Sequence, residues 1–231
     1  CAPRLLLPII VAFLVCALTS WYMAQKVDSS AAEAALLEAA VAQGRMTQAA
    51  LDEALVRLSE PPGIGAGIAA AAQGGVMALI LALLIAGYGK LFSKLAKAEN
   101  RYKSLLEVSL YATVAVGIVS LVVTVAIFQL KGVSRVSVLD AGSIVASNLG
   151  ALIDIVAGTN ALPKFVMGLA QTVDIFYIWM IALLAIGFSA VSKGLKTSTA
   201  AIWIVGAYVI CAVIYAAIQA LLAAVMGGMI G

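Results

Sequence analysis

Residues 64–88 read IGAGIAAAAQGGVMALILALLIAGY and contain no charged side chain. A helix needs about 20 mostly apolar residues to cross the hydrocarbon core of a bilayer, and this run exceeds that length. It must be helical at that depth, because unpaired backbone groups are too costly in hydrocarbon. The run ends at Tyr88, and an aromatic residue there is typical of the headgroup level. We predict a transmembrane helix over 64–88.

Four further stretches meet the same length criterion: 5–24, 104–129, 170–191 and 200–226. The sequence therefore predicts an all-α polytopic membrane protein with five transmembrane helices. Trp21 and Tyr22 close the first stretch, and Tyr102 precedes the third, as expected for aromatic residues near headgroups.

The composition agrees with a membrane protein. Of the 231 residues, 64% are hydrophobic and 11% charged, and the mean hydropathy is +1.12. Soluble domains are nearer 45–50% apolar and about 25% charged, so a water-soluble globular protein is excluded. Fourteen basic against eleven acidic residues leave a net charge of +3, too little for a nucleic-acid-binding surface. Membrane lipids are expected partners, and nucleic acid is not.

The residue types that enzymes use most are missing from the sequence. It contains no histidine, the commonest general base and zinc ligand, and neither a phosphate-binding loop motif nor Cys-x-x-Cys. We expect no catalytic residues, no cofactor and no metal. Cys16 and Cys211 lie in apolar runs, where a thiol behaves as a small hydrophobe. Cys1 stands where a Met would start the chain, so we expect a truncated or processed start, with lipidation of Cys1 left open.

Two short connections concentrate positive charge and predict the orientation. Their basic residues are Lys90, Lys94, Lys97, Arg101, Lys103, Lys193 and Lys196. With five crossings, both connections and Arg4 fall on one side, which the positive-inside rule identifies as the cytoplasm. We predict a multi-pass inner-membrane protein with a cytoplasmic N-terminus and an extracytoplasmic C-terminus. Topology alone explains the cluster in 89–103; a lipid-headgroup or partner site is the alternative.

Two longer segments fall on the opposite side. Segment 28–62 is predicted to be an extracytoplasmic helical hairpin, with a Ser30–Glu33 capping box, a first helix ending at Gly44, and a second helix capped by Thr47 and stopped by Pro61-Pro62.

Segment 131–169 is predicted to be extracytoplasmic or interfacial. A short extended piece is expected around Val133, Val136 and Val138, and an amphipathic helix over 143–158. Pro163 should open the next helix.

Small residues recur every four positions in two spans. The first set is Gly63, Gly67, Ala71 and Gly75, and the second is Ala216, Ala220, Ala224 and Gly228. Such faces let helices approach closely, either within this bundle or against another membrane subunit. Gln73, Gln129 and Gln219 are predicted to form interhelical hydrogen bonds.

Two carboxylates lie within apolar runs, where a charge is costly and tends to be paired, near an end or functional. Lys103, four residues before Glu107, can hold that carboxylate near the surface. Asp174 can cap backbone groups, bond across helices or form an ion site.

Residues Asp174-Ile175-Phe176, Trp179 and Gly187, followed by the basic turn 193–196 and Gly206, resemble a motif of the bacterial branch of the Yip (Ypt-interacting) family. The resemblance implies a five-span helical domain with a cytoplasmic N-terminus and no catalytic residues. Eukaryotic members resemble adaptors for small GTPases, whereas bacterial members look like accessory subunits, some of ABC-type exporters.

The leading hypothesis is therefore a non-catalytic accessory or scaffold subunit of a larger inner-membrane complex, which binds other integral membrane subunits and in which a transporter is one option. The alternatives are a small transporter or channel that uses Asp174, and an adaptor that recruits a cytoplasmic protein through 89–103.

Overall fold

The computed structural model describes residues 5–28, 30–59, 63–132, 136–137, 145–158 and 162–227. Several residues of the sequence predictions lie outside these ranges, namely Cys1, Arg4, Pro61, Pro62, Val133, Val138 and Gly228.

The chain is mostly helical. Its helices are α1 (Leu6–Lys26), α2 (Ser30–Ala42), α3 (Gln48–Ser59), α4 (Ile64–Leu95), α5 (Tyr102–Leu130), α7 (Leu149–Ala157), α8 (Lys164–Thr172), α9 (Ile175–Val191) and α10 (Thr197–Gly227). Two residue pairs, β1 (Val27–Asp28) and β2 (Val136–Ser137), form a small parallel sheet.

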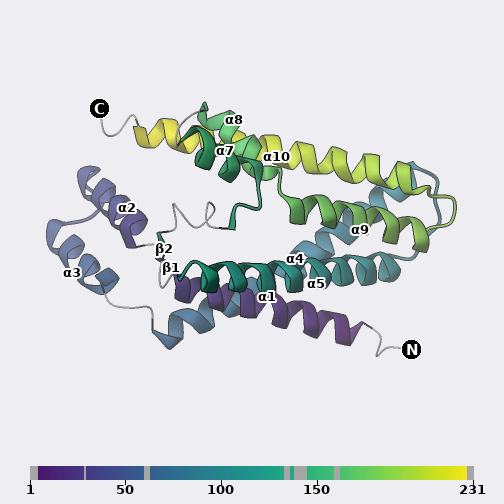
Figure 1. Cartoon of the computed structure of the whole chain (residues 1–231), viewed down its shortest axis with the longest axis horizontal. Helices are drawn as coiled ribbons and strands as arrows, with labels where there is room; N and C mark the ends of the chain where they lie inside the picture. Colours follow the sequence, from purple (N-terminus) through teal and green to yellow (C-terminus); the bar gives the residue numbers. More distant parts are fainter. Residues whose placement is uncertain are drawn as a thin grey trace.

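In the part of the chain that the structure describes, four helices are long and apolar enough to cross a membrane: Leu6–Lys26, Ile64–Leu95, Tyr102–Leu130 and Thr197–Ala224. This content fits a multi-pass all-α membrane protein. The apolar helix α9 is shorter, at 17 residues. All five lie lengthwise in the molecule, with α2 and α3 at one end and the connections α4–α5 and α9–α10 at the other (Figure 1).

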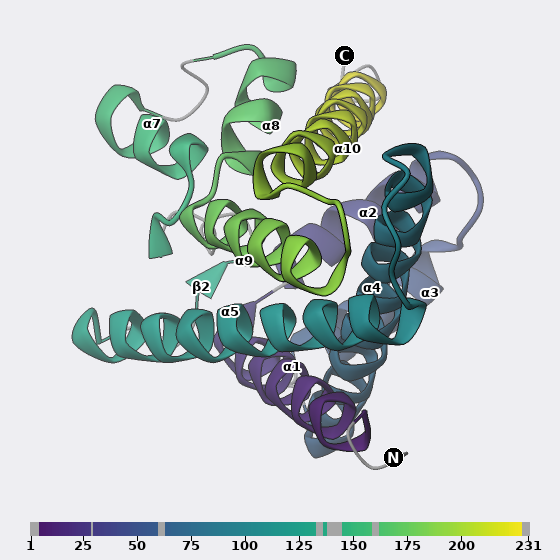
Figure 2. The same cartoon turned by 90° about the vertical axis from the view of Figure 1, so that its right-hand side faces the viewer.

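The long helices form two groups that meet along α5. Helices α1, α4 and α5 all contact one another, while α10 contacts α8 and α9, and α9 contacts α5. Viewed from the end that carries the two connections, α9 lies between α5 and α10 (Figure 2). Ala12, Ala82 and Leu110 form the small core of the first group.

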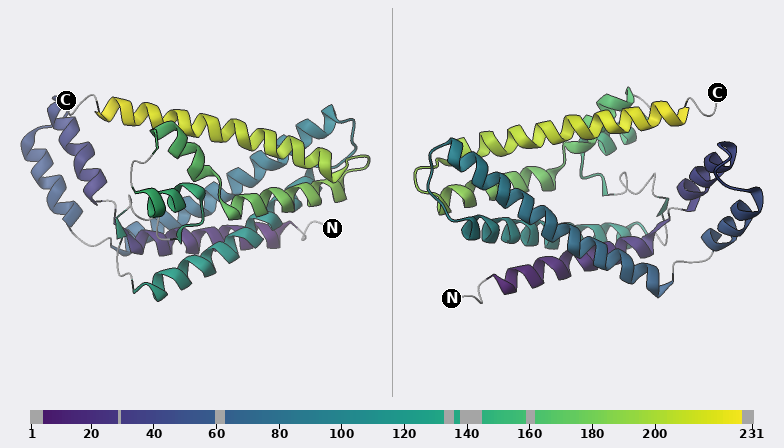
Figure 3. Two further views of the ribbon diagram at one scale, coloured as in Figure 1. Left: turned by 45° about the horizontal axis from the view of Figure 1, so that its top comes forward. Right: turned by 180° about the vertical axis from the view of Figure 1, so that it is seen from behind.

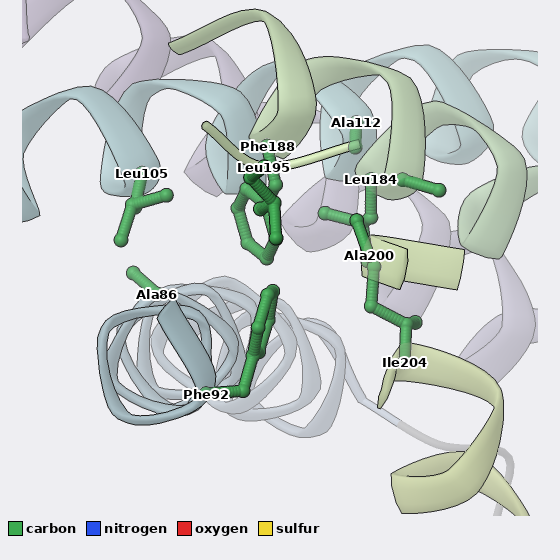
Figure 4. Close-up of a cluster of buried hydrophobic side chains, with 10 residues drawn as sticks. Ala86, Phe92, Leu105, Ala112, Leu184, Phe188, Leu195, Ala200 and Ile204 are labelled. Carbon is green, nitrogen blue, oxygen red and sulfur yellow. The ribbon is translucent and has the colours of Figure 1, made fainter. Parts of the chain in front are cut away.

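The larger core lies at the end with the two connections and joins the groups. Phe92 on α4 and Phe188 on α9 are completely buried, with ring centroids 5.9 Å apart (Figure 4). Trp203 of α10 stacks on Phe92 at 6.3 Å. Aromatic and small residues thus bring α4, α9 and α10 together at this end.

The backbones of the two connections are hydrogen-bonded to each other. The Glu99 N–H donates to the Lys193 carbonyl at 3.1 Å, and the Lys193 N–H donates to the Glu99 carbonyl at 2.8 Å. The Asn100 side chain also donates to the Ser192 hydroxyl at 3.0 Å. Segments far apart in sequence are therefore fixed side by side at one end.

Helices α2 and α3 contact each other at the opposite end of the molecule. The Thr47 hydroxyl accepts a hydrogen bond from Ala50 N–H and caps α3, and Gly44 has a left-handed φ of 67°. The N–H of Ser30 donates to the Asp28 carboxylate. Among the predicted stripe residues, Leu51 is buried, whereas Leu55 and Leu58 are half-buried.

The sequence expectation of one continuous helix over 170–191 is wrong. The chain is helical to Thr172, leaves helical geometry at Val173 and Asp174, and starts α9 at Ile175. Asp174 has extended backbone angles, and its side chain caps the new helix. The mean hydropathy of the stretch does not indicate such a break, because the apolar residues around Asp174 keep the average high.

Candidate functional site

Asp174 is buried at the break between α8 and α9, and both of its carboxylate oxygens are hydrogen-bonded. Oδ1 accepts from the Phe176 N–H at 2.7 Å, as expected for a helix N-cap. Oδ2 accepts from the Ser147 hydroxyl. The carboxylate therefore joins the start of α9 to the segment before α7.

That segment pairs with the break through its backbone as well. The Leu149 N–H donates to the Val173 carbonyl at 2.9 Å, and the Ile175 N–H donates to the Ser147 carbonyl at 3.1 Å. Asn148 caps α7 by accepting from Ala151 N–H at 2.8 Å. The break thus costs few backbone hydrogen bonds, because a neighbouring irregular segment replaces them.

Helices α7 and α8 fold back on each other beside this break, as the left panel of Figure 3 shows. Close contacts at glycines hold them in place. A Cβ on Gly150 would lie 2.5 Å from Gln171 Cγ, and a Cβ on Gly168 would lie 3.0 Å from Ala216 Cα of α10. The Tyr208 hydroxyl of α10 also donates to the Thr172 carbonyl.

A cavity of about 460 Å³ lies next to Asp174, between α1, α5, α9 and the segment before α7. Its polar lining includes Thr113, Ser120, Thr124 and Asn148. Thr113 and Thr124 are 11 positions apart, so the cavity follows α5 over about 16 Å. Hydroxyl and carboxamide groups therefore line a hollow inside the bundle.

The other residues of the Asp-Ile-Phe-x-x-Trp pattern have separate places. Phe176 lines the cavity and supplies the capped N–H, and Trp179 is half-buried on α9. A Cβ on Gly187 would collide with Val108 of α5, so this glycine allows α9 and α5 to approach closely.

The predicted small-residue face of α4 divides into two parts. A Cβ on Gly75 would lie 2.5 Å from the Phe13 ring of α1, and a Cβ on Gly67 would meet the Trp21 ring. These two glycines therefore serve packing within the bundle. A Cβ on Gly63 would have no atom within 4 Å. The sequence reasoning missed Gly74, which faces Ser20 and Cys16 of α1.

A different face of α4 has no neighbouring helix in the described part of the chain. Its exposed residues are Gly65, Ala69, Ala72, Gln73 and Val76. A Cβ on Gly65 would meet nothing within 4 Å. The Gln73 carboxamide has no hydrogen-bond partner among the described residues.

The remaining predicted polar residues do not line the cavity next to Asp174. Gln219 donates to the Tyr215 hydroxyl of its own helix at 3.1 Å. Gln129 is exposed next to the end of α5, and Glu107 is half-buried in the second turn of the same helix. The described residues contain no cluster of three or more His, Cys, Asp or Glu side chains that could hold a metal ion.

The two hydrogen-bonded connections bring the basic side chains together. Lys94, Lys97, Arg101, Lys193 and Lys196 are exposed at this end, with Glu99 as the acid among them. Lys90 is half-buried and donates to the Asn100 carbonyl and carboxamide oxygens. We call the end of the molecule that carries these exposed cations the basic end.

Sequence reasoning identified Asp174 but missed its partner Ser147. The partner lies 27 positions earlier in a segment without a regular pattern. Asn148 carried a usable signal, since an asparagine directly before an apolar helical stretch is typical of an N-cap.

Comparison with known proteins finds no family model, curated protein or solved structure that matches this chain.

Proposed function

We propose that the protein is a non-catalytic accessory subunit that binds another integral membrane protein through the open face of α4 around Gln73. The single observation that carries the proposal is the exposed Gln73 carboxamide, which has no partner among the described residues, on a helix long enough to cross the bilayer. The resemblance to Yip-family accessory proteins supports the same function.

The position of Gln73 along α4 explains why exposure there is costly. Gly67 lies beside Trp21, and Tyr88 lies 21 residues further along the helix. This interval rises about 32 Å, close to the thickness of the hydrocarbon core. With the two aromatic residues at headgroup level, Gln73 lies about 9 Å inside the hydrocarbon. A partner helix would supply the missing hydrogen bond.

The surroundings of Gln73 suit close approach of a helix. Gly65, Ala69 and Ala72 recur at helical spacing on the same exposed face. Small side chains let two backbones come close enough for van der Waals contact and interhelical hydrogen bonds, which drive association in lipid. Ile68 and Val76 are exposed on this side of α4 as well, whereas the exposed face of α10 carries large side chains such as Ile202 and Ile210.

The topology that we propose has five crossings in an inner membrane. Helix α9 completes the fifth crossing together with the folded-back α7–α8 segment. The basic end is cytoplasmic by the positive-inside rule, so α2 and α3 form an extracytoplasmic hairpin and α10 ends outside.

A photo-crosslinking residue at position 73 tests the docking face in native membranes. We expect an adduct with a second, different membrane protein, and none from the same residue at Ile202, which is 72% exposed on α10. An adduct only with lipid, or only with a second copy of this chain, contradicts the accessory-subunit proposal.

Substitution of the glutamine tests the hydrogen bond itself. We expect Gln73→Leu to weaken the association by about 1 kcal/mol, roughly fivefold, by analogy with interhelical hydrogen bonds in bilayers. Gln219→Leu is the matched control, because that glutamine already bonds to Tyr215 of its own helix. For this comparison the photo-crosslinking residue is placed at Ala69 on the same exposed face, so that residue 73 can be varied. Equal adduct yields with Gln73, Gln73→Leu and Gln219→Leu contradict a role for the Gln73 carboxamide.

A second candidate function, transport of a small polar solute or ion, is favoured by one observation. The cavity beside Asp174 carries hydroxyl groups and lies at a broken helix, an arrangement that transporters use for binding. Reconstituted vesicles that show a flux abolished by Asp174→Asn would favour transport; no flux in the wild type would favour the accessory function.

A further inference from the structure

A second and larger hollow lies between α4 and α10, with α9 as its floor. It has a volume of about 690 Å³ and reaches α8 at one end. Its walls are mostly apolar, with Leu84 and Ile85 on α4, Met180 and Leu184 on α9, and Ala207 on α10. Leu84 is 65% exposed at the rim, so the groove opens toward the surroundings of the helix bundle.

The groove is closed at the basic end and widens away from it. At the closed end Trp203 stacks on Phe92, and the Tyr88 hydroxyl donates to the Trp203 carbonyl at 2.8 Å. From there α4 and α10 diverge toward the other end of the molecule (Figure 3, right panel). The groove therefore has a fixed inner end and an open side.

Three tyrosine hydroxyl groups in the mostly apolar lining already form hydrogen bonds within the protein, and Tyr177 and Gln171 line the groove as well. Tyr88 donates to Trp203, Tyr208 donates to the Thr172 carbonyl, and Tyr215 accepts from Gln219. An occupant that brings polar groups would compete with these hydrogen bonds. The groove consequently suits an apolar occupant.

Its dimensions match one leaflet of a bilayer. The lining residues of α9 run from Tyr177 to Phe188, and this interval rises about 16 Å. Half of a 30 Å hydrocarbon core is about 15 Å. An acyl chain that extends through one leaflet therefore matches the length of the groove.

Charge at the closed end indicates the headgroup. The basic end lies directly beyond the Phe92–Trp203 stack, where Lys94 and Lys196 are exposed. Lysines near a membrane surface attract anionic headgroups by about 1 kcal/mol each.

We propose that the groove between α4, α9 and α10 binds an acyl chain of an anionic phospholipid. The chain enters from the bilayer through the open side, outside the Phe92–Trp203 stack, and its phosphate lies at the basic end, where Lys94 and Lys196 are exposed. The site is separate from the open face around Gln73, so either proposal can fail without the other.

Native mass spectrometry of the protein released from nanodiscs tests the site. The nanodiscs contain equal amounts of phosphatidylglycerol and phosphatidylcholine with the same acyl chains. We expect one retained phosphatidylglycerol per wild-type chain. Ala207→Phe, which fills the groove, should reduce retention at least fivefold, whereas Ala217→Phe, at an exposed α10 position that does not line the groove, should retain the wild-type level.

The headgroup contact has its own readout in the same experiment. Lys94→Gln combined with Lys196→Gln should retain lipid but lose the preference for phosphatidylglycerol, whereas Lys131→Gln, at the far end of α5, should keep it. The proposal is overturned if the wild type retains no lipid, if Ala207→Phe retains as much as Ala217→Phe, or if phosphatidylcholine is retained equally by the wild type. Should Ala207→Phe fail to fold, Leu84→Trp at the exposed rim replaces it with the same expected loss.

Discussion

At the scale of single residues, Asp174 is a structural carboxylate. Its two oxygens accept hydrogen bonds from Phe176 N–H and the Ser147 hydroxyl, so it stabilises the start of α9 and the segment before α7 together. The sequence shows that an aspartate in an apolar run requires a partner. It cannot show which one, because Ser147 comes from a distant irregular segment.

The side chain at position 174 can be tested by two substitutions. We expect Asp174→Ala to lower the free energy of unfolding by about 1–3 kcal/mol, through loss of the cap and of a buried hydrogen bond. Asp174→Asn should stay close to the wild type, because asparagine caps helices as well as aspartate does. Unfolding of purified protein in mixed micelles measures both. Equal losses in the two variants would mean that the charge, and not the cap, provides the stability.

At the scale of helices, the apolar runs predicted α1, α4, α5 and α10 well because length and hydropathy are local properties. The break before α9 was not predicted, since it depends on replacement hydrogen bonds from residues 147–149. The sequence also did not show which residues pack against the small residues of the helices. A four-residue spacing located Gly67 and Gly75, but only the packing shows that they face α1.

Alanine substitutions at two glycines of α4 distinguish the effect of close packing from the effect of helix propensity. We expect Gly75→Ala to lower stability by about 1–3 kcal/mol, because the new methyl group would lie 2.5 Å from the Phe13 ring. Gly87→Ala should be neutral or stabilising, since nothing lies within 4 Å of its Cβ position and alanine favours helix. The same unfolding assay measures both variants. Equal destabilisation would contradict the close packing of α1 on α4.

At the scale of the whole molecule, the helix directions place the start of α1 and both connections of the basic end together, with α2, α3 and the end of α10 opposite (Figure 1). From the sequence, the number of predicted spans placed these segments on opposite sides, and the charge of the connections was used to assign the cytoplasmic side. The sequence did not reveal that backbone hydrogen bonds join the connections, because only one residue of each takes part through its N–H and C=O groups.

Single cysteines and a membrane-impermeant thiol reagent test this arrangement in vesicles of known orientation. With the natural cysteines replaced, Lys97→Cys and Ser198→Cys should react from one side, and Gln48→Cys and Ala224→Cys from the other. All four positions are exposed. Labelling of positions 97 and 224 from the same side would require an even number of crossings and would contradict five.

The pairing of Glu99 with Lys193 has a consequence for biogenesis. During translation, residue 99 is synthesised long before residue 193, its hydrogen-bonding partner. During that interval α1, α4 and α5 are held together only by their contacts with one another. The Phe92 ring then lacks its two aromatic neighbours, Phe188 and Trp203. The bundle is therefore complete only after α9 and α10 have been translated. A nascent chain stalled before residue 188 would expose the Phe92 ring to the insertion machinery.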